Sequence, residues 1–144
     1  MSLTTDIAAF VQNVVTTCPG TEIVLGGYSQ GAAVIDIITV ATQPMFGFTN
    51  PLPDNAADHV AAVAVFGNPS IRLLGGPLTA LSPHYGYKTA DLCNGADPVC
   101  SDGNDVPAHS LYVQSGLATQ AAQFVAERLT TQAPINTLAG QSQG

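Results

Sequence analysis

Basic residues are nearly absent from this sequence. Its 144 residues include three lysines and arginines against ten aspartates and glutamates, so the formal net charge is −7. Binding to nucleic-acid phosphates requires clustered lysine and arginine side chains, and electrostatic docking on an anionic membrane requires them as well. The sequence therefore predicts no nucleic-acid partner and no attachment to membranes by charge.

Long apolar runs are also missing, although the chain as a whole is apolar. No stretch approaches the roughly 18 apolar residues of a membrane span, and the polar residues 4–6 do not fit a signal peptide. Apolar residues make up 46% of the sequence and charged residues 9%, a balance that favours a folded chain over a disordered one. We expect one domain over residues 1–144, with residues 131–144 as a mobile polar tail.

Cysteine is scarce, with three residues in all. Cys93 and Cys100 are close enough in sequence to close a small loop, which leaves Cys18 as an odd cysteine whose partner would lie elsewhere. A metal-binding pair is the alternative for Cys93 and Cys100. No second Cys or His pair is placed to complete such a site, so we expect no metal.

Short apolar strands alternate with helical patterns along the chain. The helices are expected at residues 4–17, 31–41 and 110–130, and the strands at 22–26, 60–66 and, more weakly, 87–92. Proline and glycine mark residues 43–58 and 74–86 as loops. Apolar strands alternating with helices predict an α/β fold in which a parallel sheet of about three strands lies between helices.

The first expected strand and the next helix are joined by Gly27-Tyr28-Ser29-Gln30-Gly31. A Gly-x-Ser-x-Gly sequence between a strand and a helix is typical of a nucleophilic serine on a sharp turn. Gly27 and Gly31 would let the strand and the helix approach closely, and the Gln30 N–H could donate to an oxyanion. A serine that only caps the helix is the structural alternative. The context favours Ser29 as a nucleophile.

A serine nucleophile needs a base, and three histidines are available. On folds with this kind of turn, the acid and then the histidine follow the serine along the chain. His59 precedes the second strand, where a surface position explains it, and His84 lies in a Pro/Gly-rich loop. His109 follows both the third strand and several acids, so we expect it to be the base.

The acid that orients the histidine has several candidates. They are Asp91, Asp97, Asp102 and Asp105. Asp97 lies between Cys93 and Cys100, and a disulfide across this loop would restrict the carboxylate, as suits a group that must orient an imidazole. The alternative is a purely structural staple with Asp97 as a turn residue. We expect Asp97 to be the acid.

These motifs together resemble the cutinase family. Cys18-Pro19 followed by residues 26–32 resembles the nucleophile segment of cutinases, and residues 93–100 resemble their disulfide-bounded aspartate loop. His109 falls where their histidine follows. Residues 65–69 (Val-Phe-Gly-Asn-Pro) are similar to the middle strand and turn of the actinobacterial, secreted cutinase-like esterases.

The resemblance implies an α/β-hydrolase with a Ser29–His109–Asp97 triad and a Cys93–Cys100 disulfide, working without metal or organic cofactor. It implies a secreted esterase for short or medium acyl esters, cutin-like polyesters or lipids, with a lipid or polymer surface as a partner. Acetylxylan esterases share the motifs and are the nearest alternative. A different class is an inactive cutinase-like fragment that acts only by binding or assembly.

The resemblance also predicts what this chain lacks. Cutinases begin with further N-terminal strands, and a loop there supplies a second oxyanion donor from a serine or threonine, while a cysteine there pairs with the equivalent of Cys18. We expect this chain to be the C-terminal portion, with turnover lowered by about 10²–10³ for one missing donor. Its first strand would then lie at an open sheet edge, which predicts self-association.

Overall fold

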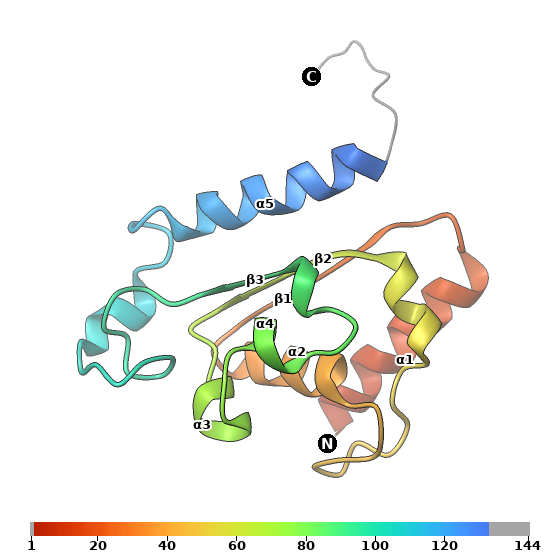
Figure 1. The fold of residues 1–144 in the computed structure, drawn as a ribbon, viewed down its shortest axis with the longest axis horizontal. Coiled ribbons are helices and arrows are strands. Elements are labelled where there is room, and N and C mark those ends of the chain that lie inside the picture. The colour runs from red at the N-terminus through yellow and green to blue at the C-terminus, as the bar shows by residue number, and fades with distance from the viewer. Residues whose placement is uncertain (1, 133–144) are drawn as a thin grey trace.

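A computed structural model describes residues 2–132, which form three layers (Figure 1). A three-stranded parallel sheet lies in the middle, with helix α5 over one face and helices α1, α2 and α4 on the other side (Figure 1). The strands are β1 Ile23–Tyr28, β2 Val60–Phe66 and β3 Thr89–Leu92. The α-helices are α1 Ser2–Thr17, α2 Gln30–Val40, α3 Ser70–Leu74, α4 Leu78–Leu81 and α5 Leu117–Gln132. The predicted α/β fold is confirmed.

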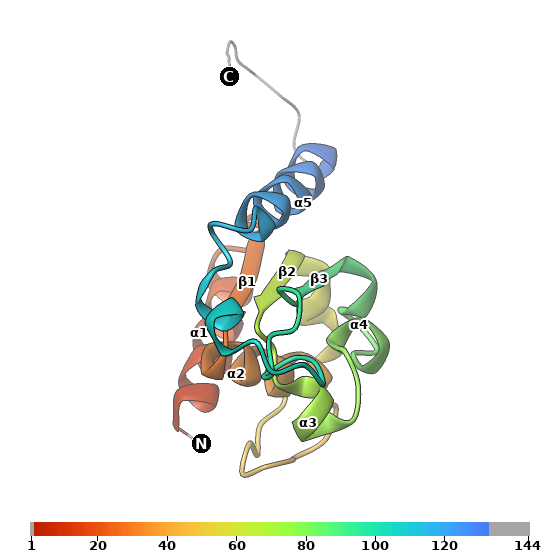
Figure 2. The same cartoon turned by 90° about the vertical axis from the view of Figure 1, so that its left-hand side faces the viewer.

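The sheet order β1-β2-β3 places β2 in the centre (Figure 2). Six of its seven residues, Val60 to Val65, are buried, as expected for an apolar strand covered on both faces. The register pairs Tyr28 with Phe66 and Phe66 with Leu92, so the three strands end level with one another. The segments that leave β1, β2 and β3 therefore emerge at one edge of the sheet.

Helix α2 fixes the first of these segments against the core. Its residues Ala32, Val34, Ile35 and Ile38 are buried, and they pack in one cluster with Val63 and Val65 of β2. Each fully buried Val or Ile side chain contributes about 1.5–3 kcal/mol relative to an exposed one. This packing holds the β1–α2 junction in place.

Some predicted elements differ from the structure. The last helix begins at Leu117 instead of residue 110, because residues 106–110 form a 3-10 helix and Gly116 has a left-handed φ of +88°. A second 3-10 helix spans residues 54–59 and α4 spans 78–81, although loops were predicted at 43–58 and 74–86. Helix α5 includes residues 131 and 132 of the predicted mobile tail, and residues 133–144 of that tail lie outside the described residues.

No helix in residues 2–132 is both long and apolar enough to cross a bilayer.

Strand β1 lies at an edge of the sheet, with Val24 40% exposed and Tyr28 47% exposed. An uncovered edge offers free backbone groups for pairing with another chain, so self-association remains a prediction. We expect light scattering to show dimers or larger species at high protein concentration, and a Val24→Lys variant to be monomeric. A wild-type chain that stays monomeric at the same concentration would contradict this expectation.

Candidate active site

Ser29 lies at the sharp junction between β1 and α2, with φ 57° and ψ −116°. A positive φ is rare for a residue with a side chain and costs about 1–3 kcal/mol, so the surroundings must hold it. The Ser29 N–H donates to the Phe66 carbonyl at 2.9 Å, and the Ser29 carbonyl accepts from the Ala33 N–H at 3.1 Å. The Ser29 hydroxyl makes no capping bond to the helix, so the alternative of a purely capping serine is wrong.

Gly27 permits the close packing of this junction. A Cβ atom at Gly27 would lie 2.5 Å from the Gly31 carbonyl oxygen, which is a clash with backbone. The expectation is wrong for Gly31, where an added Cβ would meet nothing within 4 Å. Only the strand-side glycine is therefore required by the approach of β1 to α2.

The structure brings Ser29, His109 and Asp97 together from three segments. His109 Nε2 lies 2.9 Å from Ser29 Oγ, and His109 Nδ1 lies 2.8 Å from Asp97 Oδ2. His109 comes from the 3-10 helix at Val106–Ser110, and Asp97 from the loop after β3. The three side chains predicted as nucleophile, base and orienting acid are thus linked in a row through the two ring nitrogens of His109.

Asp97 is fully buried, and its hydrogen bonds keep it ionised. Val99 N–H donates to Oδ1 at 2.8 Å, while the Tyr112 hydroxyl and His109 reach Oδ2. Burial by itself would raise the pKa of Asp97, but the bonds from Tyr112, His109 and Val99 outweigh it and hold the pKa below its ordinary value. The carboxylate can therefore stay negative beside a protonated imidazole.

Gln30 is the first residue of α2 and directly follows Ser29. The N–H groups of a helix's first turn have no partner within the helix, and the helix dipole adds partial positive charge there. The Gln30 N–H is therefore suitably placed to donate to an oxyanion formed at Ser29.

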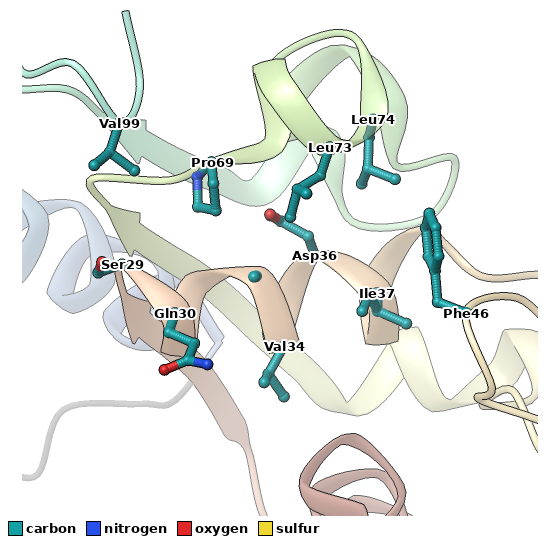
Figure 3. A pocket seen from close by; sticks show the side chains of 11 residues that line it. Ser29, Gln30, Val34, Asp36, Ile37, Phe46, Pro69, Leu73, Leu74 and Val99 are labelled. Carbon is teal, nitrogen blue, oxygen red and sulfur yellow. The ribbon is translucent and has the colours of Figure 1, made fainter. Parts of the chain in front are cut away.

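An apolar cavity of about 490 Å³ opens beside Ser29 (Figure 3). Its walls come from α2, α3 and the loops near Phe46 and Val99, and Figure 3 shows Leu73 of α3 and Asp36 of α2 pointing toward each other across the space between these helices. The lining residues are Ser29, Gln30, Ala33, Val34, Asp36, Ile37, Phe46, Pro69, Leu73, Leu74 and Val99. The space can take an apolar chain attached to the Ser29 hydroxyl.

A family model described as Cutinase matches residues 2–129, which is most of the chain. The chain belongs to the cutinase family. The phospholipase Culp4 of Mycobacterium tuberculosis is 56% identical over 124 residues, covering 86% of this chain and 54% of that protein. The carboxylesterase Culp1 of the same organism is 48% identical over 129 residues, covering 86% of this chain and 55% of that protein. The chain thus spans about half the length of these relatives.

Solved structures of cutinase-like enzymes share the fold. The catalytic core domain of acetyl xylan esterase from Trichoderma reesei has a TM-score of 0.71 at 29% identity, covering 87% of this chain and 68% of that one. A Trichoderma reesei cutinase in complex with a phosphonate inhibitor has a TM-score of 0.65 at 27% identity, covering 88% and 50%.

The aspartate loop of this cutinase-family chain is fastened at both ends. Cys93 and Cys100 form a disulfide, as expected, and a metal-binding role for these two cysteines is therefore wrong. The Arg72 guanidinium of α3 donates to the Pro98 carbonyl at 2.7 and 3.1 Å. Closing so short a loop contributes about 2–3 kcal/mol by chain entropy. Cys18 is exposed and forms no disulfide within residues 2–132, so its partner remains a prediction.

The described residues contain no group of three or more His, Cys, Asp or Glu side chains that could hold a metal ion.

Three residues of the site were not found from the sequence. The Tyr28 ring stacks on the His109 ring with centroids 5.0 Å apart, and its hydroxyl donates to the His109 carbonyl at 2.6 Å. Gly67 has φ +55°, and a Cβ there would lie 2.7 Å from His109 Cε1. Tyr112 donates to Asp97 Oδ2 at 2.6 Å. The Gly-Asn-Pro sequence after β2 indicates a turn and could have pointed to Gly67. Tyr112 lies within the segment predicted as the last helix, so no sequence pattern singled it out.

The other candidates form no hydrogen bond with this triad in the described chain. His84 Nε2 lies 3.3 Å from Asp54 Oδ1, and His59 ends the 3-10 helix before β2. Asp91 Oδ2 accepts from the Leu78 N–H at 2.8 Å. Asp102 and Asp105 are exposed on the loop.

Proposed function

We propose that this cutinase-family chain is a serine esterase with Ser29 as nucleophile, His109 as base and Asp97 as the orienting acid. The observation that carries the proposal is the pair of contacts made by one imidazole, 2.9 Å to Ser29 Oγ and 2.8 Å to Asp97 Oδ2. The strained backbone at Ser29 supports it, because such strain persists where a side chain must be presented to a ligand.

Acylation begins when Ser29 Oγ attacks the ester carbonyl carbon and its proton moves to His109 Nε2. The carbonyl oxygen becomes an oxyanion, which the Gln30 N–H stabilises at the start of α2. The C–O bond to the alcohol then breaks as His109 returns the proton to the leaving oxygen. An acyl group is left on Ser29.

Deacylation repeats these steps with water. His109 takes a proton from water, the resulting hydroxide attacks the acyl carbonyl, and the proton passes to Ser29 Oγ as the acid leaves. Throughout, Asp97 fixes the imidazole orientation, with Nδ1–H directed at the carboxylate. The free enzyme is restored without any cofactor in the scheme.

The substrate we propose is an ester with a short or medium acyl chain in a lipid or polyester. The cavity beside Ser29 is larger than an acetyl group needs and its walls are mainly apolar. Phe46 and Leu73 line it and are 61% and 54% exposed, so they can contact a lipid or polymer surface at its mouth. The names of the relatives, phospholipase and carboxylesterase, agree with this class.

We further propose that the protein is secreted, because its Cys93–Cys100 disulfide needs an oxidising compartment to persist.

Covalent trapping with a matched ester series tests the proposal. We expect the chain to hydrolyse p-nitrophenyl butyrate and octanoate faster than the acetate, and a p-nitrophenyl alkylphosphonate to stop turnover with one adduct on the Ser29 peptide by mass spectrometry. Preference for acetate would favour the acetylxylan-type alternative. A folded chain with neither turnover nor adduct would overturn the proposal in favour of an inactive fragment.

A further inference from the structure

Tyr112 contacts the three side chains proposed for catalysis through the carboxylate of Asp97. Its side chain is 6% exposed, and it is absent from the walls of the cavity beside Ser29. We propose that Tyr112 is a positioning residue whose hydroxyl fixes the Asp97 carboxylate and limits how tightly that carboxylate holds a protonated His109. This inference rests on the proposed esterase reaction.

The hydrogen bonds around the Tyr112 hydroxyl leave its proton one direction. The hydroxyl has a single proton, and the Asn94 N–H donates to its oxygen at 3.0 Å. Two acceptors lie beside it: the charged Asp97 Oδ2 at 2.6 Å, and the disulfide sulfur Cys100 Sγ at 3.4 Å, which is only a weak acceptor. A hydrogen bond of this length to a carboxylate is of the strong, charge-assisted kind. The proton of Tyr112 is therefore directed at Asp97.

Tyr112 and His109 share one carboxylate oxygen. His109 Nδ1 reaches Oδ2 at 2.8 Å and Tyr112 reaches the same atom at 2.6 Å, while Oδ1 is occupied by the Val99 N–H. Two donors on one oxygen divide its negative charge, so each weakens the attraction of the other. Without the Tyr112 hydroxyl, Asp97 Oδ2 would accept from the imidazole alone. The carboxylate would then stabilise the protonated form of His109 more strongly.

Aromatic packing fixes the Tyr112 ring independently of its hydroxyl. The centroid of the Tyr112 ring lies 6.0 Å from that of Tyr28 and 5.8 Å from that of Phe66. The ring planes cross at 70° and 71°, in edge-to-face arrangements. Tyr28 in turn stacks on His109. A phenylalanine at position 112 retains these ring contacts, so the substitution removes the hydroxyl together with its two bonds, to Asp97 Oδ2 and from the Asn94 N–H.

Other ionisable groups near this pair do not take the place of Tyr112. Tyr28 directs its hydroxyl to the His109 carbonyl, and Arg72 directs its guanidinium to the carbonyls of Pro98 and Ser101. Neither donates to the Asp97 carboxylate. A change in the proton affinity of His109 in a Tyr112→Phe variant can therefore be assigned to the lost hydroxyl.

The test compares Tyr112→Phe with Tyr85→Phe, which alters a buried tyrosine whose ring lies beside Lys88. In Tyr112→Phe we expect the acidic limb of the pH profile of kcat/KM to move up by about 0.5–1 pH unit. We expect kcat at the new optimum to fall by about 10–100-fold, because the carboxylate is less firmly placed. The NMR titration midpoint of the His109 ring should move upward by the same amount.

The NMR titration needs no turnover, so it separates this inference from the esterase proposal. Titration midpoints that agree in wild type, Tyr112→Phe and Tyr85→Phe would overturn the role of Tyr112 even in an active enzyme. If Tyr112→Phe does not fold, 3-fluorotyrosine at position 112 replaces it. The hydroxyl of 3-fluorotyrosine is a stronger donor. The acidic limb of the kcat/KM profile and the His109 titration midpoint should therefore both move to lower pH. Values that stay the same or move to higher pH would overturn the inference.

Discussion

Replacing Ser29 by alanine is expected to lower kcat for p-nitrophenyl butyrate by about 10⁶-fold, or to the uncatalysed rate if that is reached first. The variant has no atom to form the acyl intermediate, and the base at 2.9 Å has no hydroxyl to deprotonate. Alanine also fits the site without new contacts. The measurement is nitrophenol release by equal concentrations of wild type and variant, with folding checked by circular dichroism.

Ser110→Ala is the matched control for this experiment. Ser110 directly follows His109 and is exposed, and its hydroxyl donates to the Pro107 carbonyl at 3.2 Å. The Ser110 hydroxyl forms no hydrogen bond with Ser29, His109 or Asp97 in the described residues, so its loss should change kcat by no more than a few-fold. If Ser29→Ala retained most of the activity while folded, the nucleophile would have to be another residue.

The second large effect concerns stability and a carboxyl group that the proposed reaction does not use. Asp36 on α2 is fully buried, and Asn68 donates to its Oδ1 at 2.8 Å. No group in the described residues hydrogen-bonds Oδ2. Burial raises the pKa of Asp36 from 3.8 to about 7; the bond from Asn68 opposes this shift and the nearby Asp91 adds to it.

This shift makes the native state less stable as the pH rises. Between about pH 4 and pH 7, native Asp36 keeps a proton that the unfolded chain has released, so the unfolding free energy falls through this window and levels off above it. The gap between 3.8 and about 7 corresponds to an upper limit of roughly 4 kcal/mol. Asp36→Asn removes this term because an amide does not ionise.

We therefore expect Asp36→Asn to be more stable than wild type at about pH 8 by up to about 4 kcal/mol, and close to wild type at about pH 4. Urea denaturation at both pH values measures the two differences. Asp6→Asn alters an exposed carboxyl on α1 and should leave the difference between the two pH values nearly unchanged. An Asp36→Asn variant less stable than wild type at the higher pH would contradict the assignment.

Patterns short in sequence gave accurate predictions. The limits of β2 were predicted to the residue because a strand buried on both faces is a continuous apolar run. The last helix was predicted to begin at residue 110, because apolar residues recur there at helical spacing, but it begins at Leu117. Tyr112 lies before the helix and its hydroxyl donates to Asp97. The spacing of apolar residues carries no information about a hydrogen bond between a side chain and another loop.

The sequence by itself determined the family, the α/β class and the choice of Ser29, Asp97 and His109 as candidates. These depend on local chemistry, namely a glycine-flanked serine turn and a cysteine-bounded aspartate loop. Only the tertiary structure decided how Tyr28, Gly67 and Tyr112 surround the triad, and that α3 helps to wall the cavity. Those contacts join segments up to about eighty residues apart, and they arise because parallel strands end at one sheet edge, an arrangement that no short stretch of sequence contains.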